Sequence, residues 1–262
     1  MNRTGLFIAL NLAFVVGLLF GIYPELDLKL AALFYDPATK SFPLKQNTLA
    51  ALARDGAMWI AWGFAVPAIV ALVAKLVRPD RRLLISGRAM IFLLMTLFLS
   101  AGVLTNFTFK SYWGRPRPAA VTQFNGTEPF MPWWDPRGTC DSNCSFVSGE
   151  TSSAVWMTAP AMLVPPPWRY VALGVVGLYG TAVATIRMLA GGHFLSDVIF
   201  AAIFTGLVIW TVHGFLFRWP ATRTEERALD AVLAKFGRAI ARFFAGPTPS
   251  GGARPDKPIP PA

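Results

Sequence analysis

Six long apolar segments dominate this chain of 262 residues. A helix of roughly 20 apolar residues is long enough to cross the hydrocarbon core of a bilayer. Only 15% of the residues are charged, whereas soluble domains carry about 25%. The sequence therefore predicts an all-α membrane protein, a bundle of six transmembrane helices. The predicted spans are residues 6–22, 57–77, 89–107, 146–164, 170–188 and 195–217.

The first apolar segment follows Arg3 and has the composition of a signal peptide. A signal peptide ends in a small-residue cleavage site of the A-x-A type. This segment runs instead through Phe20 and Ile22 to Tyr23, Pro24 and Glu25, where no such site occurs. We therefore expect an uncleaved anchor.

Basic residues set the predicted orientation, because they concentrate in cytoplasmic loops. Residues 78–88 hold four Arg in 11 positions. With the N-terminus in the cytoplasm, 15 Lys and Arg fall inside and nine outside. Both termini are therefore predicted to be cytoplasmic. The net charge of +10 would suggest nucleic acid in a soluble protein, but here we expect no nucleic-acid partner.

Three further segments are not predicted to span the membrane. Residues 26–35 resemble a short helix lying in the outer interface. Residues 222–244 form a basic amphipathic helix, either attracted to anionic lipid at the cytoplasmic surface or packed on the protein itself. Residues 245–262 are rich in Pro and Gly and are expected to be disordered. The predicted membrane domain is residues 1–218.

Cys140 and Cys144 lie in the long segment between the third and fourth predicted spans. If that segment is periplasmic, the compartment is oxidising and a small disulfide loop is expected; the alternative is two free thiols. The whole chain contains only two Cys and two His, and we expect no metal.

Three groups of polar residues lie at the ends of predicted spans, and the predicted orientation places all of them outside. Ionisable groups at membrane depth are costly and are functional candidates. The first group is Lys110, Arg115 and Arg117, the second runs from Ser145 to Ser153, and the third is Arg187, His193, Ser196 and Asp197.

The second group begins a predicted helix at Ser148 and Gly149, where free backbone N–H groups point at an anion. One guanidinium group can donate two parallel hydrogen bonds to the oxygens of a phosphate, so the cations predict a phosphate pocket. His193 adds a nucleophile or base, and Asp197, one helical turn later, would orient its ring. The phosphate-binding candidates are Lys110, Arg117, Ser148, Gly149 and Arg187.

The sequence resembles the type 2 phosphatidic acid phosphatase (PAP2) superfamily of integral-membrane phosphatases over residues 90–215. That family has three motifs, K-x6-R-P, P-S-G-H and S-R-x5-H-x3-D, in this order. The first is complete in residues 110–118, and the third, in residues 186–197, lacks only its Ser. The second is half matched in residues 147–150, which are Val-Ser-Gly-Glu.

The resemblance implies that His193 attacks phosphorus and forms a phosphohistidine, while Asp197 holds the imidazole. It also implies that the five phosphate-binding candidates neutralise the phosphoryl oxygens, the main contribution expected in phosphoryl transfer. No metal or cofactor is implied. The partners implied are membrane lipids and a lipid phosphate substrate.

Glu150 departs from the family, which has a His acting as general acid at this position. Three nearby cations favour the charged carboxylate, which is a poor acid and repels phosphate, although burial opposes them. Three roles stay open for Glu150. It is protonated in the bound complex and acts as the acid, or it acts as a base for the water that hydrolyses the phosphohistidine, or the site is crippled.

Within the superfamily, the start of the chain and the Ser-Gly-Glu variant most resemble the bacterial lipid A phosphatase-like branch. The resemblance implies dephosphorylation of a lipid phosphate or diphosphate at the periplasmic face of the inner membrane. Undecaprenyl diphosphate phosphatase and phosphatidylglycerophosphate phosphatase are alternatives. An inactive lipid-phosphate-binding or transport protein is an alternative of another class.

Three charged residues are predicted to have no part in the site. Arg115 is interpreted as a charge facing lipid headgroups. Asp27 and Asp36 are interpreted as solvated loop charges.

Overall fold

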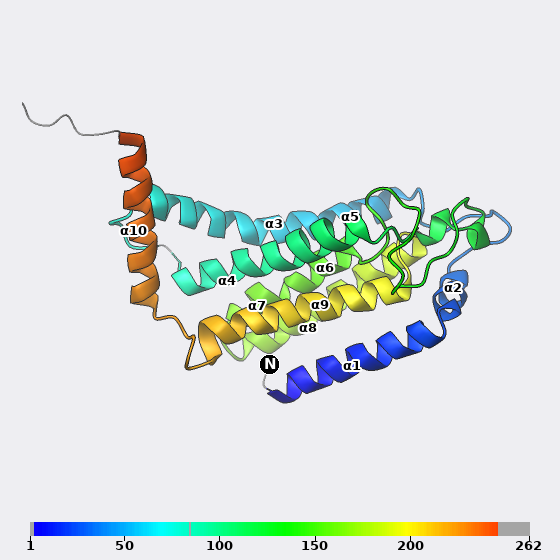
Figure 1. Cartoon of the computed structure of the whole chain (residues 1–262), viewed down its shortest axis with the longest axis horizontal. Coiled ribbons are helices and arrows are strands. Elements are labelled where there is room, and N and C mark those ends of the chain that lie inside the picture. Colours follow the sequence, from blue (N-terminus) through cyan, green and yellow to red (C-terminus); the bar gives the residue numbers. More distant parts are fainter. Residues whose placement is uncertain (1–2, 84, 246–262) are drawn as a thin grey trace, which may run out of the picture.

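A computed structural model describes residues 3–83 and 85–245 of the chain (Figure 1). The predicted tail, residues 245–262, lies outside the described residues except for Ala245. Helices make up the fold, and the described residues contain no strands beyond two isolated β-bridges. The predicted all-α class is therefore confirmed.

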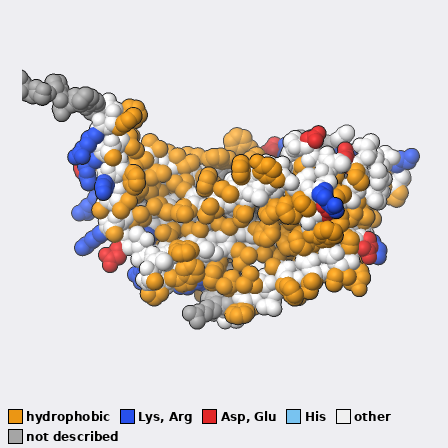
Figure 2. Space-filling view, viewed as in Figure 1, with side chains coloured by type: hydrophobic (Ala, Val, Ile, Leu, Met, Phe, Trp, Pro, Cys, Tyr) orange, Lys and Arg blue, Asp and Glu red, His pale blue; other side chains and the backbone are white. Residues whose placement is uncertain are grey.

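Long helices run side by side and form the body of the molecule (Figure 1). They are α1 (Arg3–Ile22), α3 (Thr48–Val77), α4 (Gly87–Leu97) with its continuations η1 (Phe98–Phe109) and α5 (Lys110–Tyr112), α8 (Trp168–Leu189), and α9 (Leu195–His213) with η4 (Gly214–Arg218). Within residues 3–83 and 85–245, five helices are long and apolar enough to cross a membrane. Hydrophobic side chains cover the middle of the surface and charged ones gather at its two ends (Figure 2), as a bilayer-spanning protein requires.

The fourth predicted span, residues 146–164, differs from the other five. It is divided into α6 (Gly149–Trp156) and α7 (Thr158–Leu163). Pro160 has no N–H to donate to the carbonyl of Trp156, so the helix is interrupted near Met157. Neither half is long enough to cross a membrane, and the count of six spans stays a prediction.

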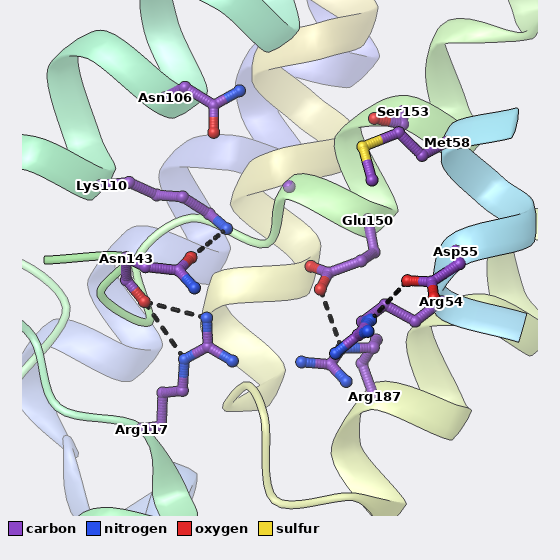
Figure 3. A pocket seen from close by; sticks show the side chains of 11 residues that line it. Arg54, Asp55, Met58, Asn106, Lys110, Arg117, Asn143, Glu150, Ser153 and Arg187 are labelled. Atoms are coloured by element: carbon purple, nitrogen blue, oxygen red, sulfur yellow. Dashed lines mark hydrogen bonds and ion pairs between the residues drawn. The ribbon is translucent and has the colours of Figure 1, made fainter. Parts of the chain in front are cut away.

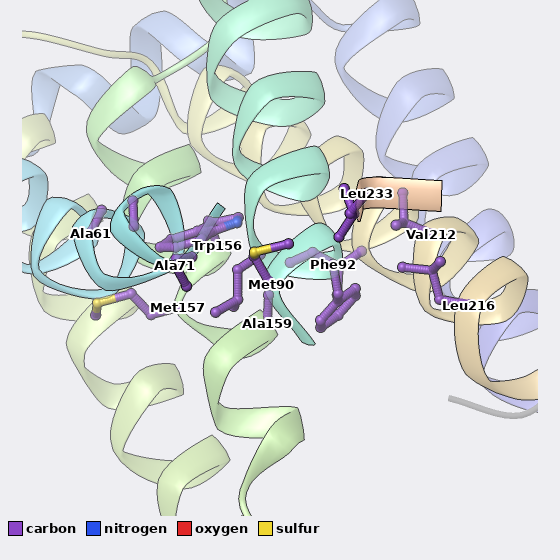
Figure 4. Close-up of a cluster of buried hydrophobic side chains, with 14 residues drawn as sticks. Ala61, Ala71, Met90, Phe92, Trp156, Met157, Ala159, Val212, Leu216 and Leu233 are labelled. Atoms are coloured by element: carbon purple, nitrogen blue, oxygen red, sulfur yellow. The ribbon is translucent and has the colours of Figure 1, made fainter. Parts of the chain in front are cut away.

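The α6–α7 pair packs in the centre of the bundle (Figure 4). Trp156 is fully buried and its indole Nε1 donates to Thr96 Oγ1 at 2.9 Å. Helix α3 presents small side chains to this core at helical spacing, which lets its backbone approach closely. These are Ala61, Ala65, Ala68 and Ala71.

Further helices stand at both ends of the bundle. Helix α2 (Glu25–Ala32) follows α1, and η2 (Pro118–Ala120) and η3 (Thr122–Phe124) belong to the connection between α5 and α6. At the opposite end, α10 (Glu226–Ala245) crosses the bundle (Figure 1). It packs on the protein through an ion pair between Lys75 and Asp230 at 2.7 Å, while Phe243 and Phe244 remain exposed.

Candidate active site

The three polar groups predicted from the sequence meet at the end of the bundle opposite α10. They come from α5 and the connection after it, from the start of α6 and the residues before it, and from the end of α8 through the first turn of α9. A cavity of about 280 Å³ lies between them (Figure 3). Its lining residues are Arg54, Asp55, Met58, Asn106, Lys110, Arg117, Asn143, Gly149, Glu150, Ser153 and Arg187.

Glu150 separates His193 from this cavity. The Glu150 carboxylate contacts His193 Nε2 through one oxygen at 3.1 Å and Arg187 Nε through the other at 3.3 Å. The His193 side chain is fully buried, and Glu150 keeps 15% of its side chain exposed. The carboxylate therefore occupies a position between a cation and the imidazole, where an incoming anion would compete with it.

Both ring nitrogens of His193 face oxygen atoms that accept hydrogen bonds. Nδ1 lies 2.8 Å from the backbone carbonyl of Ser145 and donates to it, since a carbonyl only accepts. Nε2 faces the Glu150 carboxylate at 3.1 Å. A hydrogen bond between Nε2 and Glu150 requires one proton, on either the imidazole or the carboxyl, and Nε2 is the nitrogen on the cavity side.

Asp197 lies within ion-pair distance of the imidazole, as the resemblance implies, but it makes no hydrogen bond to the ring. Its closest oxygen is 3.8 Å from His193 Nδ1, which is too long for a hydrogen bond. Ser145 links the two residues instead. Its carbonyl accepts from the ring, and its hydroxyl donates to Asp197 Oδ2 at 2.6 Å. The Phe194 backbone N–H also donates to Asp197, at 2.8 Å.

Arg115 and Asp27 are buried in an ion-pair network with Asp197. The interpretations of Arg115 as a headgroup-facing charge and of Asp27 as a solvated loop charge are therefore wrong. Arg115 is fully buried and Asp27 is 1% exposed. Arg115 Nη2 pairs with Asp27 Oδ2 at 2.7 Å, and Nη1 pairs with Asp197. Ser196 donates to Asp27 through its backbone N–H at 3.0 Å and through its hydroxyl at 2.5 Å.

Helix α2 thus contributes Asp27 to the ionic network that includes Asp197, although it is far from the motifs in sequence. Burial raises the pKa of Asp27, while the Arg115 guanidinium opposes this shift. The Arg115 guanidinium also lies 4.5 Å from the centre of the Phe194 ring, a favourable cation–π distance. Asp36, by contrast, is partly exposed, and its carboxylate accepts hydrogen bonds from Ala38 and Thr39 of its own turn.

Asn143 holds two of the predicted phosphate ligands and was missed by sequence reasoning. Its side-chain oxygen accepts from Lys110 Nζ at 2.9 Å, and its carbonyl accepts from Arg117 Nη2 at 2.9 Å. Asn143 has a left-handed backbone with φ of 51°, a conformation that Asn tolerates better than most residues. Cys140 and Cys144, on either side, are joined by a disulfide.

The start of α6 lies as the sequence predicts, but its two residues differ in exposure to the cavity. Gly149 lines the cavity, and a Cβ there would lie 3.2 Å from Lys110 Nζ. Ser148 is fully buried and caps the helix, with its hydroxyl accepting from Thr151 N at 3.3 Å. Ser148 therefore holds the helix start and does not line the cavity.

Arg54 and Asp55 on α3 also line the cavity. In the sequence they are only a charged pair just before the second predicted span, and nothing there connects them with the site. Their side chains form an ion pair at 2.8 Å. Arg54 and Arg187 both line the cavity (Figure 3). The cavity is thus lined by four cations and two carboxylates.

The cavity lined by Lys110, Arg117 and Arg187 is called the phosphate cavity below, after the ligand that its cations predict. An apolar cavity of about 450 Å³ adjoins it. The two share Met58, Asn106 and Ser153 in their linings. The rest of the apolar cavity is formed by α3, α4 and η1, including Trp62, Leu97 and Phe98. Among the described residues, no group of three or more His, Cys, Asp or Glu is placed to hold a metal ion.

A buried histidine behind a cluster of cations, at one end of a bundle of membrane-length helices, is the arrangement of an integral-membrane enzyme that acts on phosphate groups. A family model described as the PAP2 superfamily matches residues 88–223. The chain belongs to this superfamily, and it is therefore a phosphatase, a hydrolase.

Curated relatives agree with the family. A protein of Francisella tularensis subsp. novicida called lipid A 4'-phosphatase is 32% identical over 219 residues, which are 83% of this chain and 98% of that protein. A Rhizobium leguminosarum protein of the same name is 38% identical over 104 residues, 40% of this chain and 45% of that protein. A Rhizobium etli protein of the same name is 38% identical over 102 residues, 39% of this chain and 40% of that protein. No solved structure matches the chain significantly.

Proposed function

We propose that this protein removes phosphate from a phosphorylated lipid, with a lipid A-like molecule as the substrate and a phosphohistidine as the intermediate. The observation that carries the proposal is the position of His193 Nε2 behind a cavity lined by Lys110, Arg117 and Arg187. The adjoining apolar cavity supports a lipid substrate. The names of the relatives support lipid A within that class.

In the first step, a substrate phosphate enters the cavity and displaces the Glu150 carboxylate from Arg187. A phosphate dianion beside Glu150 favours the protonated carboxyl, because like charges repel. The proton held between Nε2 and Glu150 therefore passes to Glu150 and frees the lone pair of Nε2. The cations Lys110, Arg117 and Arg187 neutralise the phosphoryl oxygens as charge develops.

Bond making and breaking then follow in order. Nε2 of His193 forms a bond to phosphorus, the bond from phosphorus to the lipid oxygen breaks, and that oxygen takes the proton from Glu150. Glu150 is again a carboxylate and takes a proton from the attacking water. The water oxygen bonds to phosphorus, the P–N bond breaks, and phosphate leaves. Glu150 thus serves as acid and then as base.

We further propose that both termini are cytoplasmic and that the site faces the periplasm of a bacterial inner membrane. The charge asymmetry supports this orientation, because Asp80 and Arg88 of the Arg-rich region pair with Arg238 and Glu226 of α10. Labelling of single Cys substitutions at Lys40 and at Arg82 in intact cells tests it. A membrane-impermeant reagent should label position 40 and not position 82, and the reverse pattern contradicts the orientation.

The activity is tested by phosphate release from lipid A, undecaprenyl diphosphate and phosphatidylglycerophosphate, without added metal. Wild type should release phosphate fastest from lipid A, and His193→Ala should abolish release from all three. Faster turnover of either other lipid would favour the corresponding alternative enzyme. No release, with a raised Tm in the presence of lipid phosphate, would favour an inactive lipid-binding protein.

A further inference from the structure

A second polar cavity, of about 460 Å³, adjoins the phosphate cavity, and Glu150 is not part of its lining. The two cavities share Arg54, Arg117 and Arg187, so these guanidinium groups form the wall between them. Its volume falls within the range of about 300–1,000 Å³ typical of ligand pockets.

The chemistry of this lining differs from that of both neighbouring cavities. It contains no acidic residue, whereas the phosphate cavity contains Asp55 and Glu150. Lys45, Gln46 and Thr48 add a cation, an amide and a hydroxyl. Amide and hydroxyl groups both donate and accept hydrogen bonds, which suits a ligand with several hydroxyl groups. The apolar cavity, in contrast, adjoins the phosphate cavity through other residues.

The polar segment of this lining is fixed to the rest of the site. Leu44 N donates to the carbonyl of Leu189 at 3.2 Å, which ties the segment to the end of α8. The buried Phe42 ring packs against Gly191, where a Cβ would lie 2.5 Å from the ring and φ is +64°. Only glycine fits there without displacing the ring. These contacts hold the cavity beside Arg187.

We propose that this second cavity binds the sugar headgroup of a glycolipid phosphate, next to the phosphate that is removed. The proposal rests on the proposed function and names the substrate class of the same site. The phosphate lies among the arginines, the sugar hydroxyls lie against the segment from Lys45 to Thr48, and the acyl chains remain on the apolar side. The cavity therefore selects lipids whose phosphate is attached to a sugar.

Ala51→Trp tests this proposal, because Ala51 is exposed, lies on α3 and lines the second cavity but not the phosphate cavity. The indole fills space that the sugar needs. The value of kcat/KM for lipid A should fall by about tenfold or more, the effect of losing one or two hydrogen bonds. The value for phosphatidic acid, which has no sugar, should change less than about twofold.

Leu52→Trp is the matched control, since Leu52 is the next residue on α3, is 66% exposed and lines none of these cavities. This control variant should leave kcat/KM for both lipid A and phosphatidic acid unchanged. The proposal is overturned if Ala51→Trp leaves lipid A turnover intact, or if it lowers turnover of both lipids equally.

Binding separates this proposal from the proposed function. Wild type that releases no phosphate from either lipid contradicts the proposed function. The rise in Tm on adding each lipid then tests whether the second cavity binds the sugar. Ala51→Trp should lose the rise caused by lipid A and keep that caused by phosphatidic acid, and any other pattern rejects the sugar site.

Discussion

Asp27 offers the sharpest test of how the site is held together, because removing it leaves a buried guanidinium with one carboxylate in place of two. Asp27→Ala removes the ion pair to Arg115 at 2.7 Å and the two hydrogen bonds from Ser196. Breaking a buried ion pair by removing one partner costs about 3–5 kcal/mol. Arg115 retains Asp197 and the Met131 carbonyl, so we expect the lower end of this range.

A loss of about 3 kcal/mol corresponds to a fall in Tm of roughly 6–12 °C for a protein of this size. Thermal unfolding of the purified protein in detergent measures it. Asp27→Asn keeps the shape and the hydrogen-bond acceptor, so it should lose less. In both variants kcat should fall while KM changes little, because the Ser145–Asp197 support of His193 shifts while the phosphate ligands stay in place.

Asp36→Ala is the matched control, since Asp36 is also an aspartate of the same region but is partly exposed and its carboxylate bonds only its own turn. It should shift Tm by less than about 2 °C, as surface substitutions usually stay within about 0.5 kcal/mol. An Asp27→Ala variant with the Tm and kcat of wild type would refute the argument that Asp27 supports Arg115 and the site.

Two further predictions concern the cavity itself. Glu150→Gln keeps the shape of the side chain but cannot carry the proton, so kcat for lipid A should fall by about 10²–10⁴-fold in a phosphate-release assay; near-wild-type kcat would show that Glu150 transfers no proton. Reduction of the Cys140–Cys144 disulfide should release Asn143 from Lys110 and Arg117 and raise KM more than it lowers kcat; an unchanged KM in steady-state assays with dithiothreitol would contradict this.

Much of the site could be predicted from sequence because its residues stand at the ends of long apolar helices. Lys110, Arg117, Gly149, Glu150 and Arg187 all line one cavity. The lengths of the apolar segments located five membrane-length helices, because helix length and hydropathy are local properties. The spacing of the third motif located His193, because Arg187, His193 and Asp197 lie close together in the sequence.

The support behind the nucleophile could not be predicted, since it depends on contacts between distant segments. Asp27 and Arg115 are 88 residues apart in sequence. From sequence alone, a single Asp in a short amphipathic helix cannot be distinguished from a surface charge. Ser145 acts partly through its backbone carbonyl, which no side-chain pattern reveals. The interruption between α6 and α7 was underestimated, because a proline within an apolar segment is often tolerated in membrane helices.

The central claim is that the phosphoryl group is transferred to Nε2 of His193, and trapping of that intermediate tests it most directly. Wild type is mixed with lipid A labelled in its phosphate, quenched in alkali, which preserves phosphohistidine, and digested. We predict label on the peptide that contains His193, and none with His193→Ala. Label on another residue, or phosphate release by His193→Ala at the rate of wild type, would contradict the account.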